Sequence, residues 1–251
     1  MSNFAYMSGT GNDFIVSTYT GPTSEIQIIS LVADSDYDVD GVIFVEPLDD
    51  DSVKMHYFNS DGSDAELCVN GVRCTAKYAF DNDLVLTDNI KVHAPVGILE
   101  ATIEDSVVTV LTPVPTYIDE KIEISNIKGI SSEVGNPHFL VNVKNVETFD
   151  LESLVNKVNT SQQFPNGVNV EIYEIVNQNF IKSRVFERGV GETDACGSGA
   201  LCLFNYLYSE RKVKNPSIIS FPGGELDLEF RNKSLFLSGI VTSVSYTHLR
   251  A

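Results

Sequence analysis

Residues 186–200 read FERGVGETDACGSGA, and the interpretation of the whole chain starts from this stretch. It places the charged pair Glu187 and Arg188 a few positions before Cys196, which a Gly-Ser-Gly turn follows. The apolar run LCLFNYLY comes next and predicts a helix. A cysteine at a helix start lies beside backbone N–H groups without helical acceptors, whose partial positive charge favours a thiolate and binds carboxylates. The stretch therefore predicts an anion site beside a reactive thiol, with an inert buried cysteine as the alternative.

The pattern occurs a second time, 128 residues earlier in the chain. Residues 58–71 read FNSDGSDAELCVNG, in which Cys68 lies ten positions after a phenylalanine, as Cys196 does. A further cysteine follows each of them after six positions. Residues 11–16 and 135–141 echo each other upstream, each with Gly-Asn before an apolar run. Because internal repeats dictate architecture, we expect two similar domains, each with one cysteine at a helix start.

The predicted fold is α+β, with two pseudo-symmetric domains. Two prolines around Val114 mark the boundary between them. The first domain spans residues 1–114 and is joined by a C-terminal strand at 240–251, and the second spans 115–239. The tail 245–251 has no usable pattern, so its place in the natural fold stays open.

Apolar periodicity and turn residues predict the individual elements. Helices are expected at 25–33, about 69–80, 151–156 and about 198–208. Strands are expected at 4–19 around a turn, 41–46, 53–58, 84–86, 91–93, 97–103, 107–111, within 133–143, and at 168–176, 180–187, 218–221, 225–230 and 234–241.

Composition excludes several classes of protein. Apolar residues make up 43% of the chain, which indicates a globular fold. The net charge of −18 argues against nucleic acid or an anionic membrane as a partner, since both require basic patches. We find no signal peptide and no apolar run of the length a membrane span needs, which predicts a cytoplasmic protein with reduced thiols. The cysteine spacing matches no zinc motif and the four histidines are scattered, so no metal is expected.

Two thiols that face one cleft suit the inversion of a carbon centre. One thiolate removes a proton from one face while the opposite thiol delivers a proton to the other. Donors at the two helix ends would stabilise the charge that develops on the substrate carboxylate. His138 and Glu187 are the best candidates to set thiol protonation, and Arg188 could bind a second carboxylate. The alternatives are a turn histidine and a surface ion pair; the absence of a phosphate-binding or pyridoxal-phosphate motif predicts a mechanism without a cofactor.

At these residues the sequence resembles the diaminopimelate epimerase family. The resemblance runs from about residue 6 to 244. It is carried by GTGNDFIV (9–16), FNSDGSDAELCVNGVRC (58–74), GNPHFLV (135–141), FPNGVNV (164–170) and FERGVGETDACGSGA (186–200). It implies the family's fold, in which each half is a mixed or antiparallel sheet wrapped around a central helix. It also implies interconversion of LL- and meso-diaminopimelate in lysine and peptidoglycan precursor synthesis.

The resemblance implies a role for each matching residue. Cys68 and Cys196 would be the acid/base pair, with His138 and Glu187 as their polar supports. Backbone N–H groups of Val69, Asn70, Gly197 and Ser198 would bind the reacting carboxylate. The distal end of the substrate would be bound by Asn12, Asn59, Asn136, Asn169 and Arg188. The partner would be this small molecule, and a homodimer is left open.

The chain departs from the family pattern at Val69, where the family has glycine, at Ser8, where it usually has histidine, and at the ending of the C-terminal strand. A β-branched residue resists the backbone angles that glycine permits, so we expect a slightly shifted helix start and slower turnover than in a Val69→Gly variant. Two other functions fit parts of the pattern: a racemase of proline, hydroxyproline or histidine on the same fold, and a non-catalytic amino-acid-binding or thiol-redox protein.

Overall fold

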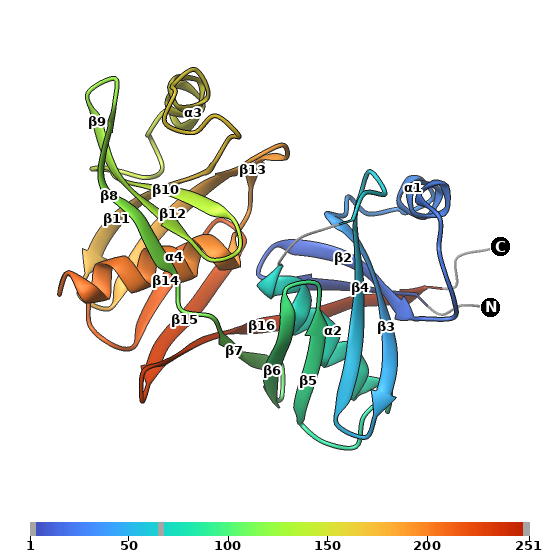
Figure 1. The fold of residues 1–251 in the computed structure, drawn as a ribbon. Helices are drawn as coiled ribbons and strands as arrows, with labels where there is room; N and C mark the ends of the chain where they lie inside the picture. The colour runs from blue at the N-terminus through green and yellow to red at the C-terminus, as the bar shows by residue number, and fades with distance from the viewer. Residues whose placement is uncertain (1–3, 65–67, 248–251) are drawn as a thin grey trace. The chain divides into compact units, whose positions relative to one another are not determined.

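The computed structural model describes residues 4–64 and 68–247 (Figure 1). The chain folds into two compact units. The first contains the residues up to Thr112 together with those from Ser238 onward, and the second is Pro113–Leu237. The chain therefore enters the first unit, leaves it for the second, and returns along one long strand.

The first unit is a closed ring of strands around a helix. The strands follow the order β1-β2-β3-β4-β5-β6-β7-β16, and β16 also pairs with β1. The helix α2 packs against β1 through β7 from within, as Figure 1 shows. The elements are β1 (Phe4–Gly9), β2 (Asn12–Thr18), α1 (Glu25–Ala33), β3 (Gly41–Asp49), β4 (Ser52–Asn59), α2 (Val69–Asp81), β5 (Asn89–Ala94), β6 (Gly97–Glu104), β7 (Val107–Thr112) and β16 (Ser234–Thr247).

The second unit repeats this plan around α4. Its strands follow the order β15-β14-β12-β11-β10-β9-β8, with β13 paired to β12 and the first residues of β16 beside β15. The helix α4 packs against β10, β14 and β15. The elements are β8 (Thr116–Ile124), β9 (Ile127–Glu133), β10 (Pro137–Asn142), α3 (Leu151–Asn159), β11 (Asn169–Asn177), β12 (Phe180–Glu187), β13 (Gly191–Thr193), α4 (Gly197–Ser209), β14 (Ser217–Phe221) and β15 (Gly224–Arg231).

Strand register shows that the two units are copies. Phe14 pairs with Gly41 between parallel strands β2 and β3, and His138 pairs with Asn169 between parallel strands β10 and β11. The next antiparallel neighbour pairs Phe58 with Val42 in the first unit and Phe186 with Val170 in the second. The predicted α+β fold of two similar halves, each with a sheet around a central helix, is confirmed.

Both central helices are buried over most of their length because strands surround them. Nearly every residue of the first two turns of α2 and α4 is buried, in contrast to the single buried stripe of a surface helix. Cys74 and Cys202 are fully buried on these helices. Each helix has a cysteine at its N-cap, Cys68 in one and Cys196 in the other.

Several predicted elements are wrong. No strand forms at 84–86, because the chain there turns from the end of α2 toward β5: the Leu84 N–H donates to Ala79 O, and Leu86 is exposed. Strand β8 and most of β9 lie where no strand is expected, and α3 extends three residues beyond the expected end. The helix start is not shifted by Val69, since α2 begins at Val69 and α4 at the matching Gly197.

The C-terminal tail belongs partly to the sheet. Strand β16 continues to Thr247, which pairs with Phe4 of β1. The remaining residues of the strand expected at 240–251, numbers 248–251, lie outside the described residues. Within the described parts of the chain, no helix combines the length and apolarity needed to cross a membrane.

Candidate active site

Cys196 lies at the N-cap of α4 and is 5% exposed. Its Sγ is 3.3 Å from Ser198 Oγ, and it donates to Glu187 Oε2 at 3.7 Å. Burial raises the pKa of this thiol well above its usual range, and the nearby carboxylates of Glu187 and Glu171 raise it further. Cys196 is therefore held as a neutral thiol, ready to donate a proton.

Glu187 ends strand β12, where the β12–β13 hairpin turns back toward α4. Its Oε1 accepts a hydrogen bond from Thr193 Oγ1 at 2.6 Å, while its other oxygen accepts from Cys196. The threonine and the thiol together fix the carboxylate beside the sulfur. Glu187 is thus the acid in direct contact with one of the two candidate thiols.

Arg188 follows Glu187 in the chain and hydrogen-bonds to residues at the start of β11 and in the loop before it. Its backbone N–H donates to Asn169 Oδ1 at 2.8 Å, and its Nη1 donates to the carbonyl of Asn166 at 3.2 Å. The side chain also lies over Gly167, where an added Cβ would come within 2.8 Å of Arg188 Cδ. A φ of +77° at Gly167 independently favours glycine. Two candidate binding residues, Asn169 and Arg188, are thus in direct contact.

His138 lies in a fully buried pair that the sequence motifs do not indicate. Its Nδ1 is 2.6 Å from Glu171 Oε1, and its Nε2 is 2.9 Å from Asn136 Oδ1. Glu171 comes from the neighbouring strand β11 and is 0% exposed, as is His138. The sequence signal for Glu171 is an acid between the apolar residues Val170 and Ile172, within a predicted strand.

A ring nitrogen of His138, an oxygen of Glu171 and Cys196 Sγ all lie within 4.8 Å of one another. These atom types also bind soft cations. Because His138 and Glu171 already hydrogen-bond to each other directly, we interpret the three as an acid–base cluster.

In the first unit, Cys68 is half-buried at the N-cap of α2 and its sulfur accepts a hydrogen bond from the Gly71 N–H at 3.3 Å. Asn70 Nδ2 donates to Asn12 Oδ1 at 2.6 Å, which joins the helix start to strand β2. Asn12 in turn lies 3.4 Å from the Asp40 carboxylate. Burial is the largest cause of the raised pKa of Asp40, with hydrogen bonds from Asp13 and Asn12 acting in the opposite direction.

Arg73 supports this network from inside the unit, and no motif pointed to it. It is fully buried, and it donates to Asn70 Oδ1 at 2.8 Å, Thr10 Oγ1 at 2.9 Å and the carbonyl of Ile240 at 3.1 Å. Burial lowers the pKa of its guanidinium to about 10. In the sequence it is marked only as a charged residue between Val72 and Cys74, near the start of the predicted helix.

Asn59 ends β4 and its side chain donates to Ser63 Oγ at 2.9 Å, within the loop that leads toward Cys68. Residues 65–67 of that loop lie outside the described residues. The four candidate carboxylate donors are the first two residues of each helix: Val69 and Asn70 in α2, Gly197 and Ser198 in α4. N–H groups at these positions lack intrahelical acceptors and are available to an anion.

The structure thus groups the candidate residues by unit. Cys68, Val69, Asn70 and Asn12 lie at the start of α2, and Asn59 lies on the loop before it. The second group contains Cys196, Gly197, Ser198, Glu187, Arg188, Asn169, Asn136 and His138. All four cysteines of the chain are reduced thiols.

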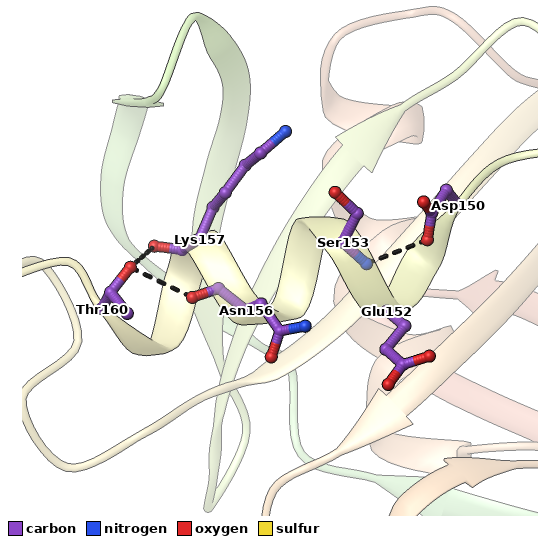
Figure 2. A pocket seen from close by; sticks show the side chains of 6 residues that line it. All are labelled: Asp150, Glu152, Ser153, Asn156, Lys157 and Thr160. Atoms are coloured by element: carbon purple, nitrogen blue, oxygen red, sulfur yellow. Dashed lines mark hydrogen bonds between the residues drawn. The ribbon is translucent and has the colours of Figure 1, made fainter.

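Two surface depressions in the second unit contain none of these residues. Figure 2 shows the one along α3, lined by Asp150, Glu152, Ser153, Asn156, Lys157 and Thr160. Its polar groups are largely those that terminate the helix: the Ser153 N–H donates to Asp150 Oδ1, and Thr160 Oγ1 donates to the carbonyls of Asn156 and Lys157. The other depression lies between the β9 side and residues 141–150.

The fold is shared with several solved structures. A phenazine biosynthesis protein of the PhzF family from Enterococcus faecalis matches with a TM-score of 0.76 at 16% identity, over 99% of this chain and 100% of that one. A hydroxyproline epimerase from Agrobacterium vitis with bound trans-4-hydroxy-L-proline matches with a TM-score of 0.70 at 13% identity, over 98% and 90%. The chain therefore has the two-unit fold of these solved structures.

Sequence comparison narrows the class to one family. The diaminopimelate epimerase family model matches residues 4–118 and 130–243. A diaminopimelate epimerase from Brachyspira hyodysenteriae is 33% identical, with 94% of this chain and 95% of that protein covered. One from Methanococcus maripaludis is 32% identical, with 96% and 97% covered. This chain belongs to the diaminopimelate epimerase family.

Proposed function

We propose that this protein is an isomerase that interconverts LL- and meso-diaminopimelate without a cofactor, with Cys68 and Cys196 as its acid/base pair. The observation that supports this most strongly is the matched pair of cysteine N-caps. Each unit has one thiol at the start of its buried central helix, at equivalent positions of a repeated fold. A binding protein has no need of this duplication, whereas inversion of a carbon centre requires a proton donor and a proton acceptor on opposite faces.

The reaction moves one proton in each direction at the α-carbon. The Cys68 thiolate removes the α-proton from one face, and the Cys196 thiol gives its proton to the other. Cys196 suits the donor role because its burial and the carboxylates beside it favour the neutral thiol. In the reverse reaction the two sulfurs exchange roles.

The α-proton of an amino acid is weakly acidic, so the developing negative charge needs fixed donors. Paired helix ends supply them: the N–H groups of Val69 and Asn70 from α2, and those of Gly197 and Ser198 from α4, bind the reacting carboxylate. Glu187 sets the protonation of Cys196 through its contact with the sulfur.

The distal amino-acid end of the substrate is bound by amides and one guanidinium. Arg188 pairs with the distal carboxylate, and Asn12, Asn59, Asn136 and Asn169 bind the remaining polar groups. A substrate with a second charged end accounts for this set better than proline does. We place the protein in the cytoplasm, in lysine and peptidoglycan precursor synthesis, with the small-molecule substrate as its partner.

The test is hydrogen exchange in D2O. LL-diaminopimelate incubated with the reduced protein is expected to gain one α-deuterium as it becomes the meso isomer. Cys68→Ala and Cys196→Ala should each abolish epimerisation, because each removes the proton transfer on one face. Cys74→Ala and Cys202→Ala are matched controls, since these thiols are buried in the core and should retain turnover.

The outcomes separate the alternatives. Exchange with proline, hydroxyproline or histidine alone would identify a sister racemase. A protein that binds diaminopimelate without any α-exchange would be a binding or redox protein, and the proposed function would be wrong.

A further inference from the structure

The buried pair of His138 and Glu171 has an unusual hydrogen-bond pattern. Both ring nitrogens face oxygen atoms, Nδ1 at 2.6 Å from Glu171 Oε1 and Nε2 at 2.9 Å from Asn136 Oδ1. An imidazolium paired with the Glu171 carboxylate satisfies both contacts, and so does a neutral imidazole whose Nδ1 accepts the proton of a neutral Glu171 carboxyl. The two forms differ by one proton moved along the 2.6 Å contact, and only the ion-pair form places a cation beside the thiol.

The first unit shows that the fold does not need this pair. In the repeat, the strand positions of His138 and Glu171 correspond to Phe14 and Ile43, as the register of the parallel strands shows. Both of these apolar residues are fully buried. The same architecture is thus built with an apolar pair beneath one thiol and an ionisable pair beneath the other.

The helix above each pair carries a glycine that accommodates it. A Cβ on Gly71 would meet Ile43 Cδ1 at 3.3 Å, and a Cβ on the equivalent Gly199 would meet Glu171 Oε1 at 2.4 Å. The second oxygen of Glu171, Oε2, is buried and has no hydrogen-bond partner among the described residues. A buried carboxylate with a single partner lowers stability relative to an apolar residue, so its presence calls for a role beyond folding.

We infer that Glu171 is a positioning residue for the chemistry at Cys196: it holds His138 as an imidazolium beside the sulfur, which stabilises the thiolate that forms whenever Cys196 gives up its proton. A His138 nitrogen lies within 4.8 Å of Cys196 Sγ, and a cation within about 4–6 Å favours the charged form of an acid. The predicted change in kcat rests on the proposed function, whereas the predicted change in Cys196 titration does not.

The groups around the sulfur act with opposite signs. Glu187 from β12 and Glu171 from β11 oppose the thiolate, whereas hydrogen bonds from the Ser198 hydroxyl and the Gly199 N–H favour it. In the inferred ion pair, His138 from β10 adds a cation that also favours the thiolate. A further thiol on α4, Cys202, is held neutral because burial raises its pKa. Glu171 therefore has two possible effects on Cys196: a direct repulsion and an indirect stabilisation through His138.

The sign of the change in a Glu171→Gln variant separates these effects. The test measures the rate of alkylation of each cysteine by iodoacetamide against pH, with peptide mass spectrometry to assign the sites. Loss of the carboxylate should leave His138 neutral, so the pH midpoint for Cys196 should rise and its rate at pH 8 should fall about tenfold, the equivalent of one pKa unit. Cys68 serves as the internal control and should keep its midpoint.

Two further variants complete the experiment. In a His138→Gln background, Glu171→Gln should no longer raise the Cys196 midpoint, because the imidazolium is already gone. Glu171→Ile, which installs the residue of the first unit, should act in the same direction as Glu171→Gln and provides a folded alternative if the amide variant is unstable. The kcat should fall in both Glu171 variants, with KM changed much less.

A fall in the midpoint on Glu171→Gln would mean that Glu171 acts only by direct repulsion, and an unchanged midpoint would mean a structural role. Either result overturns the inference. Because alkylation requires no substrate, a raised midpoint in a protein that does not turn over diaminopimelate would sustain the inference and reject the proposed function alone.

Discussion

Arg73 is a buried cation that donates hydrogen bonds to neutral oxygens. Those oxygens belong to three separate segments: Thr10 after β1, Asn70 at the start of α2, and Ile240 in β16. A buried charge is costly unless it is well hydrogen-bonded, and the Nε of Arg73 has no partner within the described parts of the chain. The hydrogen bond from Arg73 therefore fixes the orientation of Asn70, and Asn70 in turn fixes that of Asn12.

An Arg73→Met variant is expected to fold with lowered stability, because the side-chain volume is kept while three oxygens lose their donor. Asn70 and Asn12 lose their fixed orientation, so KM for diaminopimelate should rise about tenfold, the equivalent of roughly one hydrogen bond. The kcat should change less. Steady-state kinetics and circular dichroism measure both effects.

The matched control is Lys77→Met on the same helix, where the lost group is a partly exposed i,i+4 pair with Asp81. Such pairs contribute little to stability, so this variant should behave as the parent does. An Arg73→Met protein with parental KM would show that Arg73 does not orient the binding residues.

Among the secondary-structure elements, the two central helices differ in what lies beneath their first turn. Gly71 and Gly199 occupy equivalent positions, but one faces Met55 and Ile43 and the other faces the Glu171 carboxylate. The flexible Met55 side chain can move, whereas the Glu171 carboxylate is fixed by His138. The same substitution should therefore have different effects in the two helices.

Gly199→Ala is expected to lower the free energy of unfolding by about 2 kcal/mol and to impair turnover, because the new Cβ overlaps Glu171 Oε1. Gly71→Ala should stay within about 1 kcal/mol of the parent, since the gain in helix propensity offsets a small rearrangement of Met55. Urea unfolding and steady-state rates measure both variants. An equal loss of unfolding free energy in the two variants would show that the Glu171 carboxylate beneath α4 and the Met55 side chain beneath α2 yield equally to an added Cβ.

For the whole protein, the free energy of unfolding at alkaline pH depends on the ionisation of the buried thiols. Burial raises the pKa of Cys74 to about 12, and it also raises the pKa of Cys202 and Cys196. The folded state then binds more protons than the unfolded state above pH 9.0, the ordinary value for a thiol. The stabilisation is complete below pH 9.0 and is lost as pH rises toward 12. Arg73 acts with the opposite sign, because its pKa is lowered from 12.5 to about 10.

We therefore expect the free energy of unfolding to fall between pH 9 and 12, with each buried thiol contributing a slope of up to about 1.4 kcal/mol per pH unit. Cys74→Ala should reduce that slope, although it lowers stability at neutral pH by creating a cavity. Thr75→Ala, a buried neighbour without a titrating group, should lower stability equally at every pH. Denaturant titrations at several pH values measure the slopes, and identical slopes in the two variants would contradict the assignment.

Much of the fold could be predicted from local spacing. Helix α1 matches its expected bounds. Cys68 and Cys196 lie at the N-caps of α2 and α4, where helix starts are expected. The errors came where apolar residues serve another purpose, as at 84–86, or where strand patterns are weak, as in β8 and β9. Periodicity reports which residues are buried, and it does not report whether the chain is extended there.

The repeat, the two thiols at helix starts and the polar residues next to them in the chain could all be read from the amino-acid sequence, because motif spacing and helix periodicity are local properties. The contacts of Glu171 with His138, 33 residues away, and of Arg73 with Ile240, 167 residues away, arise only once the chain has folded. Those contacts depend on the register of β10 against β11 and on the closure of the sheet by β16. The strand register and the sheet closure are both set by packing among segments that are distant in the chain, and a single sequence does not show which distant segments pack together.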